Sequence, residues 1–232
     1  SIFIKFYGKI ENTIENNSEK RIKIESINIE NIVKYKIYKV TSGKLYTNRV
    51  QDTAILLDNK IIEGPSFQLR HKPNGKIFNS NISENIVFKT GTPRILKELK
   101  GTVLSLLTGG GGNNNYWHWL YDVLPRFYLA GKTVELNQID YFLLPSIKKK
   151  YQKETLDSLK IEKNKRLSSE KYRHIKANQL IITDHPYVIT GDSTKDITNI
   201  PTWIINWLKK TFIIKKNING KDITKKFYID RK

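Results

Sequence analysis

Two side chains in the middle of the chain have the types and the spacing of an acid–base pair. His118 and Asp122 are four residues apart, so in a helix they lie on one face and within reach of each other. A carboxylate beside an imidazole fixes the tautomer of the ring and stabilises its charged form, which suits a general base. On spacing alone, an ion pair on a helix surface is the commoner explanation, and both explanations stay open at this point.

The loop before this pair is rich in glycine and asparagine. Gly111 and Gly112 end a run of four glycines and leave room for a ligand near the backbone, and Asn115 can cap the helix that follows. Free N–H groups at such a helix start can hold an anion. The loop lacks both the Gly-Lys-Ser/Thr of ATPase phosphate loops and the Gly-x-Gly-x-x-Gly dinucleotide fingerprint. A flexible turn is therefore the simpler alternative.

An aromatic and a basic side chain complete this segment. Trp117 would ordinarily belong to a hydrophobic core, but an indole face also stacks on sugar rings. Arg126 lies one turn beyond Asp122, although Pro125 is expected to kink the helix just before it. The segment thus places a candidate base, a candidate platform and a cation within one expected helix.

Alternation of apolar and polar residues predicts strands in the first part of the chain. Residues 21–29 and 35–40 alternate with period two, and short apolar runs follow at 53–57 and 60–62. We therefore expect a β-rich module over residues 1–92.

After residue 92 the pattern changes to short apolar runs between longer segments of helical periodicity. Such alternation predicts an α/β fold with a parallel, Rossmann-like sheet over residues 93–225. In such sheets ligands bind at the carboxyl ends of the strands, where the segment around His118 belongs. Residues 160–173 are expected to form a charged surface connection. Strands are expected at 102–107, 141–144 and 179–183, and helices at 116–130, 148–159 and 201–212.

The pattern Asn115-x-x-His118-x-x-x-Asp122-x-Leu124-Pro125 resembles the signature of glycosyltransferase family 61, in particular its bacterial capsular-polysaccharide members. Similar stretches flank it, so the resemblance extends over residues 43–232. It implies one Rossmann-like half of a GT-B glycosyltransferase. It also implies inverting transfer of a sugar from a nucleotide-sugar donor to a hydroxyl of a growing glycan, with no metal or other cofactor required.

The resemblance also implies roles for single residues. We expect His118 to act as the base and Asp122 to orient it, with the reverse assignment left open. Arg126 or Arg231 is expected to contact the donor phosphate. The remaining substrate-binding residues are expected to be Asn115, Trp117, Gly111 and Gly112.

The donor-side half of the family has no counterpart in the sequence. Residues 226–232 read as the first strand of such a half, and the family's His-Gly-Ala type motif would follow them. We therefore expect the chain to supply the acceptor side, and to be inactive without the donor side.

Charge and composition limit the partners. A formal net charge of +19 would favour nucleic acid or anionic lipid. The basic residues are spread through every segment, and abundance of Ile, Lys and Asn is typical of A+T-rich genomes, so no nucleic-acid partner is expected. We therefore expect a cytoplasmic protein with loose peripheral contact at the inner face of the membrane.

The sequence contains no cysteine, so thiolate metal sites and Cys nucleophiles are excluded. A non-catalytic carbohydrate-binding domain and a basic nucleic-acid-binding module stay open as alternatives.

Overall fold

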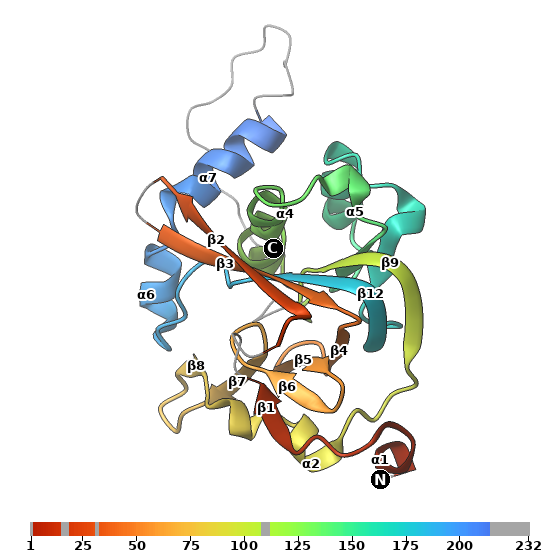
Figure 1. Ribbon diagram of the computed structural model, residues 1–232. Coiled ribbons are helices and arrows are strands. Elements are labelled where there is room, and N and C mark those ends of the chain that lie inside the picture. The colour runs from red at the N-terminus through yellow and green to blue at the C-terminus, as the bar shows by residue number, and fades with distance from the viewer. Residues whose placement is uncertain (1, 15–18, 31–32, 108–111, 214–232) are drawn as a thin grey trace, which may run out of the picture.

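One mixed β-sheet runs through the computed structural model, which describes residues 2–14, 19–30, 33–107 and 112–213 (Figure 1). The strands follow the order β1-β6-β5-β4-β12-β9-β10-β11, with β2 attached through β3 to β12, and β8 through β7 to β5. The protein is thus a mixed α/β protein, as the sequence predicts. The strands are β1 (Asn12–Ile14), β2 (Ile22–Ile29), β3 (Val33–Thr41), β4 (Lys44–Thr47), β5 (Asp52–Leu57), β6 (Lys60–Ile62), β7 (Phe67–His71), β8 (Ile77–Asn79), β9 (Lys97–Ser105), β10 (Tyr141–Leu144), β11 (Arg166–Ser168) and β12 (His174–Thr183).

The four strands described after residue 92 pair in parallel with one another. β9 lies between β12 and β10, and β11 follows β10, with all three pairings parallel. The expected strand at 102–107 is therefore confirmed as a central strand over residues 102–105, and β9 begins earlier than expected, at Lys97. Neighbouring residues of β9 face opposite sides, because Leu104 packs in one hydrophobic cluster and Val103 in another. Burial on both faces explains why this strand reads as a continuous apolar run.

The strands before residue 92 join the same sheet. β3 and β4 both pair antiparallel with β12, so the sheet runs across the expected boundary at residue 92. Val40 and Leu45 from this first part share a hydrophobic cluster with Val103 and Leu180 from the second. The parallel strands that carry the candidate site are thereby anchored to the N-terminal strands.

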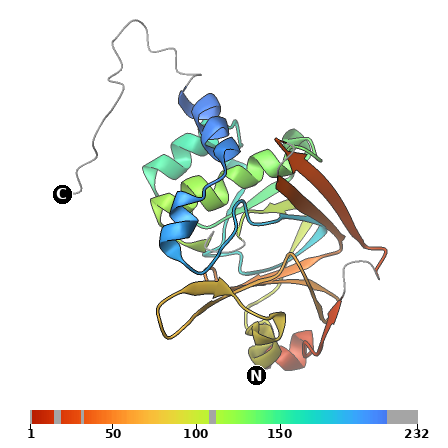
Figure 2. The same cartoon turned by 90° about the vertical axis from the view of Figure 1, so that its left-hand side faces the viewer.

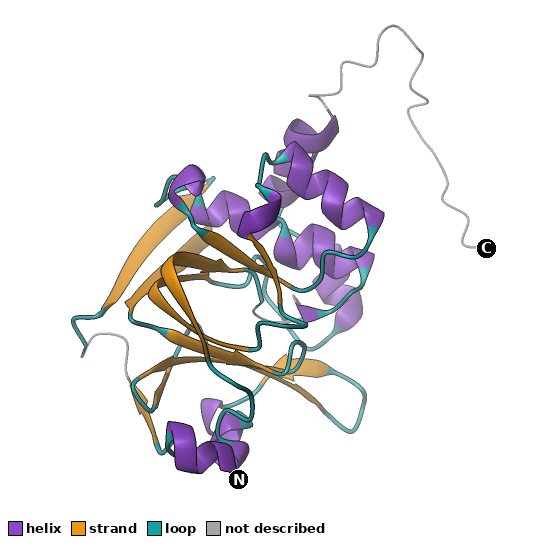
Figure 3. Ribbon diagram, turned by 90° about the vertical axis from the view of Figure 1, so that its right-hand side faces the viewer, coloured by secondary structure: helices purple, strands orange, loops and turns teal. Residues whose placement is uncertain are grey.

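Helices cover the sheet on two sides. The main helical layer lies against β9, β10 and β12, while α1 and α2 lie at the other end of the molecule (Figures 2 and 3). No helix in the described residues is long and apolar enough to cross a membrane. The α-helices are α1 (Ile2–Tyr7), α2 (Val87–Thr90), α3 (Tyr116–His118), α4 (Pro125–Ala130), α5 (Lys150–Ser158), α6 (Ser193–Thr198) and α7 (Thr202–Leu208).

The segment 160–173 differs from its prediction as a charged surface connection. It contains β11, which pairs with β10, and the side chain of Arg166 is only 5% exposed. The guanidinium donates to the carboxylate of Asp157 at 2.5 Å and to the carbonyl oxygen of Ile161 at 3.0 Å. The charge is thus satisfied inside the fold, which a count of charged residues does not reveal.

Candidate active site

The expected helix at 116–130 forms, and Asn115 caps it. The side-chain oxygen of Asn115 accepts a hydrogen bond from the backbone N–H of Trp117 at 2.8 Å. In the loop before it, Gly112 packs so closely on the main chain that an added Cβ would lie 0.9 Å from the carbonyl oxygen of Arg49. No larger residue fits there without a shift of the backbone. Gly111 and Arg231 lie outside the described residues.

A π-turn interrupts this helix at Trp119–Val123. The backbone N–H of Leu124 donates to the carbonyl oxygen of Trp119 at 3.0 Å, and Pro125 then begins α4. Asp122 lies inside this wider turn and is fully buried. Turns of this kind are rare and occur frequently at functional sites.

His118 and Asp122 form the contact that their spacing predicts. Nδ1 of His118 lies 2.6 Å from Oδ2 of Asp122, with the histidine side chain 28% exposed and the aspartate 0% exposed. The pair is therefore not an ion pair on the surface. Because the carboxylate is an acceptor, we assign the shared proton to Nδ1, and Nε2 is then the nitrogen that can take a proton from a ligand.

The pair shifts the pKa of both partners. Burial lowers the pKa of His118, but the hydrogen bond to Asp122 and the negative charge of that residue outweigh burial, so the pKa lies above its usual 6.5. Burial alone would raise the pKa of Asp122, but its contacts with His118 and His185 hold this pKa well below the usual 3.8. Asp122 is therefore an anion at neutral pH and strengthens His118 as a base.

His118 lines a cavity of about 510 Å³. The wall beside it is aromatic, because Trp117 and Tyr187 both line the cavity and Trp117 packs on Tyr121 with ring centres 4.1 Å apart. Lys76 and Asp192 also line the cavity, and Nζ of Lys76 lies 3.9 Å from a carboxylate oxygen of Asp192. The other lining residues come from the loop after β4, the β7–β8 hairpin, the helix start and the segment after β12: Val50, Gln51, Leu69, His71, Asn74, Gly75, Ile77, Asn113, Asp122, Ile189, Gly191, Asp196 and Ile197.

Arg126 lies behind Asp122 and not among the residues that line this cavity. The side chain is fully buried, and Nε donates to the main-chain oxygen of Asp122 at 2.7 Å. One terminal nitrogen donates to the main-chain oxygens of Thr183 and Asp184 at 3.1 and 3.2 Å. Burial lowers the pKa of Arg126 to about 10. Arg126 thus ties the helix to the carboxyl end of β12, and this placement does not support the predicted contact with a donor phosphate.

Sequence reasoning missed two residues of this site, His185 and Tyr187. Nε2 of His185 lies 3.8 Å from Oδ2 of Asp122, and Tyr187 forms part of the cavity wall. Burial and the negative charge of Asp122 raise the pKa of the Tyr187 hydroxyl. Both residues follow directly after β12. Their position beyond the end of a parallel strand is the signal that could have identified them.

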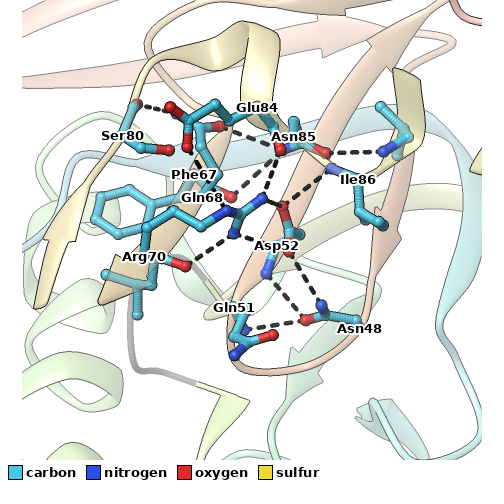
Figure 4. Close-up of polar contacts among 12 residues, drawn as sticks. Asn48, Gln51, Asp52, Phe67, Gln68, Arg70, Ser80, Glu84, Asn85 and Ile86 are labelled. Atoms are coloured by element: carbon cyan, nitrogen blue, oxygen red, sulfur yellow. Dashed lines mark hydrogen bonds and ion pairs between the residues drawn. The ribbon is translucent and has the colours of Figure 1, made fainter. Parts of the chain in front are cut away.

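A second buried carboxylate holds one wall of the cavity. Asp52 accepts from both terminal nitrogens of Arg70, at 2.8 and 3.2 Å, and from the backbone N–H of Ile86 at 3.1 Å (Figure 4). The side chain of Asn48 donates to Asp52 at 3.1 Å, and its oxygen accepts from the backbone N–H of Gln51 at 3.0 Å. This network fixes the loop whose Gln51 lines the cavity.

The described residues contain no group of three or more His, Cys, Asp and Glu side chains arranged to hold a metal ion. No protein-family model matches the chain, and comparison with curated proteins and with solved structures gave no match either.

Proposed function

We propose that this chain supplies the acceptor side of an inverting glycosyltransferase of GT-B architecture. The enzyme moves a sugar from a nucleotide-sugar donor to a hydroxyl of a growing glycan. The observation that carries this proposal is the 2.6 Å contact between His118 and the buried Asp122 at the wall of a cavity. The resemblance to glycosyltransferase family 61 rests on the same residues. The parallel order β12-β9-β10-β11 with covering helices supports a Rossmann-like half.

In the proposed reaction the acceptor oxygen forms a bond to the anomeric carbon of the donor sugar. The bond from that carbon to the phosphate oxygen breaks, and its electron pair leaves with the nucleoside diphosphate. Nε2 of His118 takes the hydroxyl proton, and Asp122 stabilises the resulting imidazolium. General-base catalysis of this kind contributes about 10²–10⁴-fold.

The charges around the cavity support the acceptor role. Among the described residues that line it, Lys76 is the one side chain with a permanent positive charge, and it lies against Asp192. Asp122 and Asp196 add further negative charge. A diphosphate is disfavoured by such a wall, whereas a neutral sugar hydroxyl is not. The phosphates of the donor are then held by groups outside this cavity.

Two measurements test the proposal. In NMR spectra of the chain, neutral disaccharides should move the indole signal of Trp117, one of four tryptophans, whereas uridine diphosphate should not. In the complete gene product, His118→Ala should lower the transfer rate at least 100-fold. Uridine diphosphate bound against Trp117, or transfer that survives His118→Ala, would refute the assignment.

The aromatic wall formed by Trp117 and Tyr187 also favours a second candidate, a carbohydrate-binding domain without catalysis. The same variant separates the two functions. A binding domain keeps its full activity as a sugar binder in His118→Ala and shows no transfer in the wild type.

We also propose a location for the chain, at the cytoplasmic face of the membrane. The net charge of +19 supports loose contact between a cytoplasmic enzyme and anionic lipid at the inner face of the membrane. Salt-dependent binding to vesicles that contain phosphatidylglycerol would test this contact.

A further inference from the structure

His185 is a buried histidine whose outer ring nitrogen has no hydrogen-bond partner among the described residues. Its side chain is 8% exposed, and the ring stacks on Phe67 with centres 5.9 Å apart. Nδ1 lies 2.8 Å from the carbonyl oxygen of Tyr187, while Nε2 is buried and unpartnered. Buried polar atoms without a partner are uncommon, so this one calls for an explanation.

Asp122 has a similar unpartnered atom. Oδ2 contacts His118, whereas the buried Oδ1 has no hydrogen-bond partner in the described residues. The unpartnered nitrogen of His185 lies 3.8 Å from Oδ2 of the same carboxylate. That distance is too long for a hydrogen bond but within the range of an ion pair. Two buried atoms without hydrogen-bond partners, Nε2 of His185 and Oδ1 of Asp122, thus belong to neighbouring side chains.

The charged and polar groups around His185 indicate whether Nε2 carries a proton. Asp122 is the carboxylate nearest to Nε2, and Arg126 supports Asp122 from behind through the main chain. Asp184 precedes His185 and accepts from the backbone N–H of Lys36 at 2.7 Å. Tyr187 contacts the His185 ring edge to face, with centres 4.5 Å apart. A lone pair on Nε2 would point at the anionic Asp122, whereas an N–H there would stabilise it.

We propose that His185 is a second positioning residue of the site and is held as an imidazolium. Nδ1 then donates to the carbonyl oxygen of Tyr187, and Nε2 carries a second proton directed at the carboxylate of Asp122. Both imidazoles then approach Oδ2 of Asp122, with Nδ1 of His118 at 2.6 Å and Nε2 of His185 at 3.8 Å. His185 is not among the residues that line the cavity of His118, so it acts through Asp122 and not on the acceptor. Only the consequence for transfer rests on the proposed function.

The proposed N–H on Nε2 of His185 should lower the titration midpoint of His118. A carboxylate that accepts from two donors attracts each of them less strongly than a carboxylate with one donor. Loss of His185 should therefore strengthen the attraction between Asp122 and protonated His118. The titration midpoint of His118 should rise by about 0.5–1 pH unit, the equivalent of one net hydrogen bond. Loss of His185 also leaves Asp122 with one contact fewer, so the carboxylate is held less firmly for the reaction.

Imidazole ¹⁵N NMR on histidine-labelled chain tests this directly, since the chain has four histidines. In the wild type, Nε2 of His185 should carry a proton. His185→Gln places an amide N–H near the Nε2 position and should leave the His118 midpoint close to that of the wild type. His185→Asn places its amide near the Nδ1 position, leaves Asp122 without the second donor and should raise the midpoint. His174→Asn is the matched control, because His174 is buried like His185, has Nδ1 3.0 Å from the carbonyl oxygen of Arg94 and does not line the cavity. This change should leave the His118 midpoint unmoved.

Transfer by the complete gene product gives a second readout. His185→Asn should lower kcat about tenfold with KM unchanged, and His185→Gln should restore most of the rate. An unprotonated Nε2 in wild-type His185, or a His118 midpoint unmoved in His185→Asn, overturns the proposal. The first result needs no variant and stands even where His185→Asn fails to fold. If the midpoint shifts as expected while no form of the protein transfers sugar, the positioning role holds and the proposed function fails.

Discussion

Two buried aspartates, Asp52 and Asp122, have opposite surroundings. Asp52 is 3% exposed and accepts hydrogen bonds on both oxygens, two of them from the guanidinium of Arg70. Asp122 is 0% exposed, and one of its oxygens has no hydrogen-bond partner among the described residues. Its shortest contact is with His118, which is partly exposed at a cavity.

The partners explain the difference. Arginine keeps its proton under all ordinary conditions, so the network of Asp52 can only hold the fold together. Histidine gains and loses a proton near neutral pH, so the carboxylate of Asp122 serves a group that can react. A fully satisfied buried carboxylate therefore indicates a structural role, and an incompletely satisfied one beside a cavity indicates chemistry.

The largest expected effect comes from Asp122→Asn. In the complete gene product this change should lower the transfer rate by about 10²–10⁴-fold, because Asn cannot stabilise a protonated His118 by charge. The melting temperature should change by only a few degrees, since an amide fills the same space. The measurement is the rate at saturating donor and acceptor, with a melting curve as the control. A folded variant within threefold of wild type would remove Asp122 from the mechanism.

Asp52→Asn should show the converse behaviour. Removal of this charge leaves Arg70, 27% exposed, without its main ionic partner and should lower the free energy of unfolding by about 3 kcal/mol. Urea unfolding measures that loss. The transfer rate of the folded fraction should stay within a few-fold of wild type. A rate loss as large as that of Asp122→Asn, without a stability loss, would show that the two sites do not differ as described.

The pH dependence should separate rate from stability. His118 must be unprotonated to act, and its pKa is raised, so the rate should increase about tenfold per pH unit up to that pKa and then level off. A raised pKa in the folded state stabilises the fold below the unfolded value of 6.5, and this contribution is lost as pH rises through the folded pKa. The transfer rate and the free energy of unfolding in urea can both be followed from about pH 5 to 9. Near the pKa of His118 the rate should rise with pH, while the contribution of His118 to stability should fall. In Asp122→Asn the rate profile should move to lower pH.

Trp117→Leu should have the smallest effect. Loss of the indole platform should raise KM for the acceptor about 2–10-fold with little change in kcat. Tyr116→Leu is the matched control, because Tyr116 is exposed, adjoins Trp117 and is not among the residues lining the cavity. Equal effects of the two substitutions would argue against stacking on Trp117.

Local patterns in the sequence predict local structure well. Most of the apolar run at 102–107 lies in β9, which ends at Ser105. The four-residue spacing of His118 and Asp122 gives the expected contact even though a π-turn intervenes. Such patterns indicate which residues are neighbours within one element. This is enough to predict the contact between His118 and Asp122, because both belong to the same helical segment.

Long-range packing was beyond these patterns. The sequence does not show that β12 joins the first strands of the chain to the parallel part, or that Arg126 bonds to main-chain oxygens at the end of β12. His185 approaches Asp122 from 63 positions along the chain, as their numbers show. These contacts depend on how elements cross in space, which periodicity does not encode.

A kinetic double-mutant cycle shows whether His118 and Asp122 act together as one base. Transfer rates are measured for wild type, His118→Ala, Asp122→Asn and the double variant of the complete gene product. The effects of residues that act as a unit are strongly non-additive. The rate of the double variant should therefore lie within about threefold of the rate of His118→Ala. Losses that multiply, with the double variant slower by the product of the two single effects, would show that His118 and Asp122 act independently and would contradict the proposed mechanism.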